Sequence, residues 1–352
     1  MQLKLPNALA KGQPGILHQY VCHCPWLVAF EFTRGNQRKP HSLIFIGGLS
    51  DGLWTVDYMT DLVAALQHSE WSVFSLVLSS SYNGWGVGRL GKDIDEIAQC
   101  VQYVRDYKKQ LFGAGKVVIM GHSTGSQDVM HYLSCPNPRP RHPVLDREID
   151  PLTRTSVDGA IMQAPVSDRE SILSVLNDGT ERDSPEVMQE IYRKAVADAK
   201  ENTYEDDDTV ETVVPLSVTA RIGYPSSTAV SSRRFLSLAS PDSPRKPDED
   251  DLFSSDLSDE QLQQTFGVIG SRGLLKSKFM VLYSGRDQSV PPWVNKEALL
   301  KRWSTAAGPS WHQKSMIIPN ASHALSDPDQ AEPRRILAER VIAYLDEVTK
   351  EV

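Results

Sequence analysis

Short runs of apolar residues alternate with helical patterns over the first third of the chain. The runs are those of buried strands, and they predict strands at 16–23, 26–32, 42–47, 72–78, 116–120 and 157–163. Between them, apolar residues recur three or four positions apart and predict helices at 54–68, 89–109 and 124–133. This alternation predicts an α/β fold with a mostly parallel central sheet flanked by helices.

The regular pattern stops at residue 166 and returns at residue 278. The intervening segment contains a helical piece near 185–200, an acidic run at 205–208 and a Ser/Pro/Asp-rich stretch at 237–258 that is typical of loops. Strands at 278–284 and 314–319 and helices at 293–303 and 332–349 complete the pattern. We predict a core domain built from residues 1–165 and 278–352. The segment 166–277, between the sixth and seventh predicted strands, is predicted to be a cap over the functional site.

The composition is that of a folded, acidic protein. Of the 352 residues, 40% are hydrophobic, and 37 Lys and Arg against 45 Asp and Glu give a net charge of −8. Since nucleic-acid backbones attract basic surfaces, we expect no nucleic-acid partner. No run approaches the roughly 20 apolar residues of a membrane helix, and the first residues lack a signal-peptide core. We therefore expect no membrane partner and a cytoplasmic location; the sequence does not indicate an oligomeric state.

The chain has four cysteines, which are too few for a disulfide scaffold. Cys22 and Cys24 lie near the end of the first predicted strand, where alternation would direct both thiols to one face as a buried pair. Their spacing is not that of a zinc site, so no metal is expected.

The strongest chemical motif is Gly121-His122-Ser123-Thr124-Gly125, a G-x-S-x-G pentapeptide between a buried strand and a helix. This context is the one in which the motif forms a sharp turn that exposes a nucleophilic serine. The turn strains the backbone at Ser123, and side chains at the two glycine positions would clash. An incidental serine in a tight turn is the alternative interpretation.

A serine nucleophile requires a base and an orienting carboxylate, in the chain order Ser, Asp or Glu, His. Asp287 and His323 each follow one of the two late strands, so all three groups can meet at the same sheet edge. Asp287 could instead cap the following helix, in which case Asp168 is the substitute acid. His323 could also be an ordinary surface histidine.

Two amides are expected to stabilise the oxyanion. Thr124 follows the nucleophile, and the loop 47–52 after the third strand offers Leu49, with Gly48 as the second choice. Further candidate substrate-binding residues are Tyr82 and Trp85, in the loop after the fourth strand, and His122, which could equally be packing residues.

These motifs resemble the α/β-hydrolase superfamily over residues 16–165 and 278–349. The segments SLIFIGGLSDG, VVIMGHSTGSQD, YSGRDQSVP and PNASHALS are more narrowly similar to a fungal branch that hydrolyses ester bonds of fusarinine-type hydroxamate siderophores inside the cell. The resemblance implies a carboxylic ester hydrolase with Ser123 as nucleophile, Asp287 as acid and His323 as base. It also implies a small-molecule substrate of the fusarinine C or triacetylfusarinine C type, which brings its own iron, so no cofactor is expected.

In the family picture, fusarinine-type siderophores carry free amines that are cationic at neutral pH. The net charge of −8 and the acidic runs at 205–208 and 248–251, which we expect to be solvated, would favour them over acetylated relatives.

Two other functions remain open. One is a general carboxylesterase or acyl-thioesterase for lipid-like substrates. The other is a non-catalytic receptor on a hydrolase fold, for which an intact Ser, Asp and His set is not needed.

Overall fold

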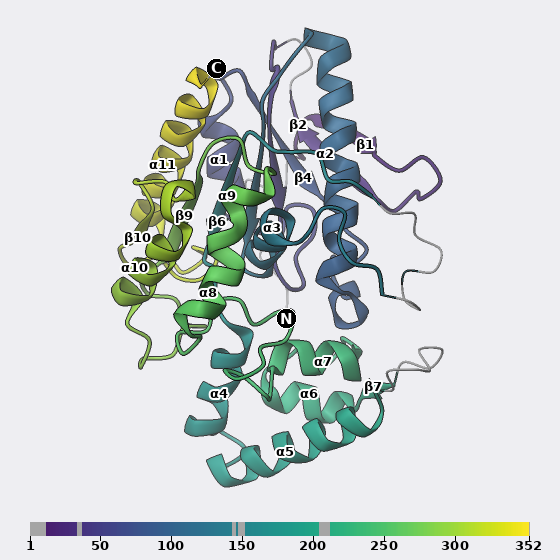
Figure 1. The fold of residues 1–352 in the computed structure, drawn as a ribbon, viewed down its shortest axis with the longest axis vertical. Coiled ribbons are helices and arrows are strands. Elements are labelled where there is room, and N and C mark those ends of the chain that lie inside the picture. The colour runs from purple at the N-terminus through teal and green to yellow at the C-terminus, as the bar shows by residue number, and fades with distance from the viewer. Residues whose placement is uncertain (1–11, 34–36, 143–145, 147–151, 204–211, 352) are drawn as a thin grey trace.

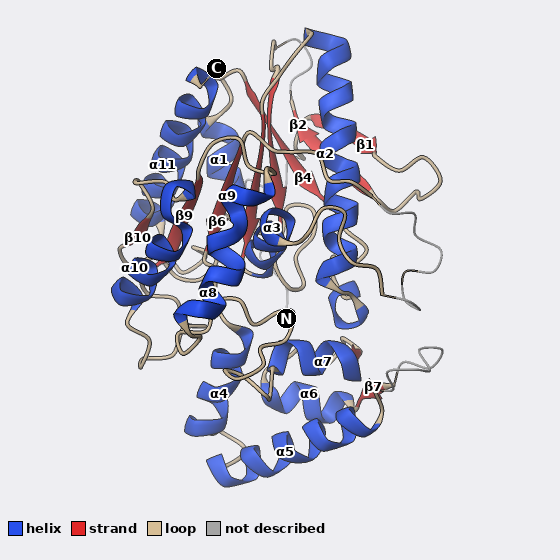
Figure 2. Cartoon of the chain, in the orientation of Figure 1, coloured by secondary structure: helices blue, strands red, loops and turns tan. Residues whose placement is uncertain are grey.

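One mostly parallel sheet forms the centre of the molecule (Figures 1 and 2). Within the described residues its strands are, in spatial order, β1 (Gly15–Gln19), β2 (Val28–Phe32), β4 (Trp71–Leu76), β3 (His41–Ile46), β5 (Val117–His122), β6 (Gly159–Gln163), β9 (Phe279–Ser284) and β10 (Met316–Ile318). β2 pairs antiparallel with both β1 and β4, and the remaining pairs are parallel. This order is that of the α/β-hydrolase fold, which confirms the predicted fold class.

The predicted acidic run at 205–208 lies outside the residues that the computed structural model describes, which are 12–33, 37–142, 146, 152–203 and 212–351. Among the described residues, no helix combines the length and the apolar character needed to cross a membrane.

Helices cover both faces of the sheet, as the apolar strand sequences require. In β3, Leu43 and Phe45 enter one hydrophobic cluster while Ile44 and Ile46 enter the other, because successive side chains of a strand point to opposite faces. The first cluster is closed by α1 (Met59–Ala65) and α11 (Ala331–Lys350). The second is closed by α2 (Leu90–Phe112), α3 (Thr124–Ser134) and α10 (Lys296–Ala307).

Two predicted elements near the N-terminus are shorter in the structure. The helix expected at 54–68 begins only at Met59, because Trp54 has a φ of 64°, which a right-handed helix does not accommodate. β1 ends at Gln19, so the predicted buried pair of thiols is wrong. Cys22 is exposed in the turn that follows, and Cys24 is half-buried.

The segment between β6 and β9 divides into two parts. Its first part has a hydrophobic cluster of its own and lies beyond the carboxyl ends of the sheet strands (Figure 1). The elements of this part are α4 (Asp168–Asp178), α5 (Pro185–Glu201), β7 (Val213–Val214), α6 (Leu216–Ile222), β8 (Val230–Ser231) and α7 (Ser232–Ala239). In the second part, Leu252, Phe253 and the helix α8 (Asp259–Thr265) pack into the cluster on the α2 and α3 face of the sheet.

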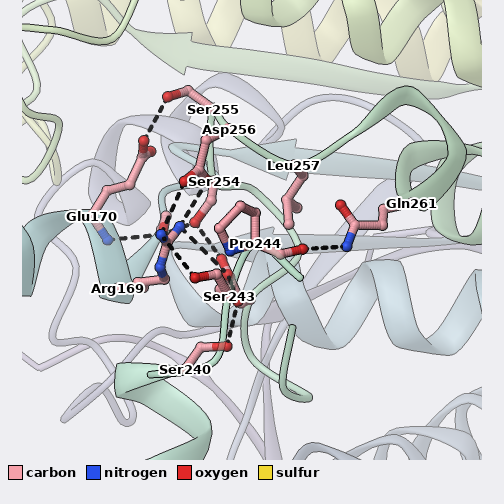
Figure 3. A network of polar contacts seen from close by, with 12 residues as sticks. Arg169, Glu170, Ser240, Ser243, Pro244, Ser254, Ser255, Asp256, Leu257 and Gln261 are labelled. Carbon is pink, nitrogen blue, oxygen red and sulfur yellow. Dashed lines mark hydrogen bonds and ion pairs between the residues drawn. The ribbon is translucent and has the colours of Figure 1, made fainter. Parts of the chain in front are cut away.

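Residues 237–239 of the Ser/Pro/Asp-rich stretch end α7, and the rest is a loop, as predicted, but it is fixed by polar contacts (Figure 3). Arg169 of α4 donates two hydrogen bonds to Asp256, at 2.7 and 2.9 Å, and Ser255 donates one to Glu170 at 2.5 Å. The prediction that the acidic run at 248–251 is solvated is wrong for Asp250 and Asp251, which are 1% and 3% exposed. Asp250 accepts from Arg234 of α7, whereas Asp251 accepts from Ser243 and Ser254 of the same loop.

Candidate active site

The G-x-S-x-G segment forms a sharp turn from β5 into α3. Ser123 has φ 54° and ψ −123°, a strained conformation for a residue other than glycine. A Cβ added to Gly121 would lie 2.0 Å from the carbonyl oxygen of Gly125, and one added to Gly125 would lie 2.4 Å from that of Ile46. The two glycines therefore allow three backbone segments to meet beneath the serine.

The structure brings together the three residues that the sequence predicts as nucleophile, acid and base. His323 Nε2 lies 2.8 Å from Ser123 Oγ, and His323 Nδ1 lies 2.8 Å from Asp287 Oδ2. The Asp287 side chain is fully buried, and its second oxygen accepts a hydrogen bond from the amide of Ser289. The imidazole thus joins the serine hydroxyl to a buried carboxylate, which is the geometry of a hydrolase triad.

The surroundings of His323 favour its protonated form. Burial lowers the pKa of this imidazole, but the hydrogen bond to Asp287 and the charge of that carboxylate outweigh burial and raise the pKa above its ordinary value. A proton taken from Ser123 would therefore be held by a stabilised imidazolium.

The structure matches neither alternative from the sequence, that Asp287 caps a helix or that Asp168 is the acid. The helix after Asp287, α10, has Asn295 as its N-cap, so Asp287 caps no helix there. Asp168 opens α4 and accepts a hydrogen bond from Gln127 at 3.0 Å. It lies close enough to His323 to influence its pKa, but the imidazole bonds to Asp287.

The predicted oxyanion loop lies against the nucleophile. The amide of Gly48 donates to Asp51 Oδ2 at 2.8 Å, which leaves the next amide, that of Leu49, as the candidate donor from this loop. Thr124 is the first residue of α3, where the backbone N–H has no partner within the helix. Gly48, the neighbour of Leu49, lies against Ser123, and the oxyanion role of Leu49 and Thr124 stays a prediction.

Tyr82 and Trp85 contact the oxyanion loop directly. The backbone N–H of Tyr82 donates to the carbonyl oxygen of Asp51 at 2.8 Å, and the Trp85 indole N–H donates to Ser50 Oγ at 3.0 Å. Trp85 is 2% exposed and lies 5.2 Å, ring to ring, from Tyr224 of the insertion. Both residues therefore position the loop, and Trp85 joins it to the insertion.

His122 is buried beside His323, and sequence reasoning missed its partner, Gln163. The Gln163 side chain lies 2.5 Å from His122 Nδ1, accepts from Tyr58 at 3.1 Å and donates to the carbonyl oxygen of His323 at 3.4 Å. Burial and the neighbouring His323 lower the pKa of His122 to about 4, so it is neutral at pH 7. A glutamine that ends an apolar strand is the signal that could have indicated this role.

The chain is similar to several known proteins over nearly its whole length. Residues 7–346 match a family model described as "Protein of unknown function (DUF1749)". An esterase of Emericella nidulans is 53% identical over 363 residues, covering 97% of this chain and 95% of that protein. The fusarinine C esterase sidJ of Aspergillus fumigatus is 52% identical, covering 96% and 97%. The solved structure of the siderophore hydrolase EstB from Aspergillus fumigatus is 51% identical, has a TM-score of 0.85 and covers 97% of this chain and 99% of its own.

Proposed function

The chain belongs to the DUF1749 family, and we propose that it is a serine esterase that hydrolyses ester bonds of fusarinine-type hydroxamate siderophores. The observation that carries the proposal is the His323 imidazole, 2.8 Å from both Ser123 Oγ and Asp287 Oδ2. The names of the relatives support the substrate class, because one that is 52% identical over nearly its whole length is called a fusarinine C esterase.

The proposed reaction proceeds in two steps. His323 takes the proton of Ser123, whose oxygen attacks the ester carbonyl, while Asp287 holds the imidazole and stabilises its cation. The amides of Leu49 and Thr124 receive the negative oxygen of the tetrahedral intermediate. His323 then returns the proton to the departing alcohol, and water hydrolyses the acyl-enzyme by the same route.

Two further roles complete the proposal. Helices α4–α7 would form a cap over the carboxyl ends of the strands and so shape the substrate site. The iron of a ferric siderophore would be part of the substrate, and ester cleavage inside the cell would weaken the chelate and help to release the metal.

The test is mass spectrometry of ferric fusarinine C incubated with wild-type protein and with Ser123→Ala. We expect linear and monomeric products from the wild type alone. If the wild-type protein reacts with a fluorophosphonate but leaves the siderophore intact, it is a serine hydrolase with a different substrate. If the wild-type protein does not react with the fluorophosphonate, the proposed esterase mechanism is wrong.

A further inference from the structure

A small polar cavity lies behind the oxyanion loop, between α2, α3 and α7. It has a volume of about 20 Å³, which is room for one group the size of water or ammonium. Its lining includes Gly48, which lies against Ser123, and Thr124, which follows it in the chain. Asp93 of α2, Asp128 of α3 and Arg234 of α7 also line it. The cavity is therefore next to the position proposed for the reacting carbonyl.

Three buried oxygen atoms at this cavity have no hydrogen-bond partner among the described residues: Asp93 Oδ1, Asp128 Oδ1 and Thr124 Oγ1. Their side chains belong to residues that are 3%, 3% and 7% exposed. A buried polar atom without a partner costs about 1–3 kcal/mol, so three together indicate that something else binds there.

The charges around the cavity favour a cation. Arg234 donates to Asp250 at 2.5 Å, and its Nε has no partner among the described residues. Two carboxyl groups, Asp93 and Asp128, remain at the cavity besides this ion pair. Burial and the nearby Glu96 raise the pKa of Asp93 to about 7. Burial and Asp93 raise the pKa of Asp128 well above its ordinary value, although His131 and Arg234 act in the opposite direction. Carboxyl groups in this state release their protons when a cation arrives.

Building on the proposed esterase function, we propose that this cavity binds a primary ammonium group on the acyl side of the ester, next to the carbonyl that reacts. An ammonium group has three N–H donors and no acceptor, which matches the three unpaired oxygens of Asp93, Asp128 and Thr124. Because Leu49 and Thr124 both line the cavity and flank the oxyanion position, the group that enters must be attached within one or two bonds of the carbonyl carbon.

A site for one ammonium group acts differently from the overall charge of the protein. The net charge of −8 would attract any cation from a distance, and its effect would fade as salt is added. Two buried carboxylates beside the nucleophile would instead select the position of the ammonium group within the substrate, and this selection would persist at high salt.

The test uses two small esters that do not depend on siderophore recognition, alanine ethyl ester and N-acetylalanine ethyl ester. At pH 7 and high salt, we expect the wild type to give a kcat/KM at least about tenfold higher for the ester with the free ammonium, the value of one charge-assisted hydrogen bond. Asp93→Asn and Asp128→Asn should each remove most of this preference, because kcat/KM should fall more for the free-ammonium ester than for the acetylated one. Asp95→Asn is the matched control, since Asp95 is 5% exposed on the same helix but pairs with Arg139 instead.

A second measurement needs no variant. Methylammonium chloride should inhibit hydrolysis of the acetylated ester by the wild type, whereas the same concentration of sodium chloride should not. Equal rates for the two esters in the wild type, or no inhibition by methylammonium, would overturn the proposal and leave ordered water as the occupant. If the wild type discriminates between the two esters but does not hydrolyse ferric fusarinine C, the ammonium site is supported and the siderophore is not the substrate.

Discussion

Gly48 lies directly against Ser123. A Cβ added to Gly48 would be 2.6 Å from the Cβ of Ser123 and 3.1 Å from the carbonyl oxygen of His122. His122 ends β5 and Ser123 forms the strained turn that follows, so neither can move away without displacing the nucleophile. The space above the serine therefore depends on the absence of a side chain at position 48.

Gly48→Ala is expected to reduce kcat by about 10² or more, because the methyl group would displace either the serine or the loop that carries the Leu49 amide. The measurement is steady-state hydrolysis of p-nitrophenyl acetate, with thermal melting to establish that the protein is folded. Gly270→Ala is the control, since a Cβ there would meet only a serine hydroxyl at 3.2 Å. Near-normal kcat in Gly48→Ala would mean that the loop is not part of the catalytic site.

Trp85→Phe is expected to lower kcat several-fold to tenfold while the free energy of unfolding changes by less than about 1 kcal/mol. The substitution removes the indole N–H that bonds Ser50 and retains a ring near Tyr224. Trp85→Ala would additionally leave a cavity and cost about 3–5 kcal/mol of stability. Urea unfolding and steady-state kinetics on the two variants separate the effects. A large loss of stability in Trp85→Phe with unchanged kcat would contradict a role in positioning the loop.

The parts of the site that follow from chain order could be predicted from the sequence. Ser123 is marked by a local motif, and Asp287 and His323 follow because parallel strands place their carboxyl ends at one edge. The contacts of Trp85 could not be predicted, because Ser50 and Tyr224 are distant in sequence and meet only in the folded chain.

Buried charges were the main source of error. Asp250 lies in a sequence that is typical of solvated loops. Its burial depends on Arg234, which belongs to α7. Asp93 and Asp128 stand on separate helices, and no sequence pattern indicates that both line one cavity. Hydrophobic periodicity predicts which face of a helix is buried, but not which polar residue is buried with it.

Asp287→Asn is expected to reduce kcat/KM by roughly 10³–10⁴, because the amide would no longer hold the imidazole in its correct tautomer. It should also change the pH profile. In the wild type, His323 must be neutral to act as base, and its raised pKa places the acidic limb of kcat/KM above pH 6.5. Without the carboxylate, that limb should move to lower pH. The measurement is kcat/KM for p-nitrophenyl acetate from pH 5 to 9.

The matched control for this prediction is Asp168→Asn, which removes the alternative acid. Asp168 also raises the pKa of His323 through its charge, so a small shift of the limb to lower pH is expected, with less than a tenfold loss of kcat/KM. A greater loss in Asp168→Asn than in Asp287→Asn would reverse the assignment of the acid.

His122 is expected to make the fold sensitive to mild acid. Its pKa is about 4 in the folded protein against 6.5 for an ordinary histidine, so the unfolded chain binds more protons between these values. Stability should therefore fall as the pH drops from 6.5 to 4, by up to about 3 kcal/mol. His122→Asn retains an N–H donor for Gln163 but cannot be protonated in this range, so it should lose this pH dependence, although its stability at pH 7 will be lower. Urea unfolding from pH 4.5 to 7.5 measures the effect, with exposed His68→Asn as the control. An unchanged slope in His122→Asn would show that other groups cause the acid sensitivity.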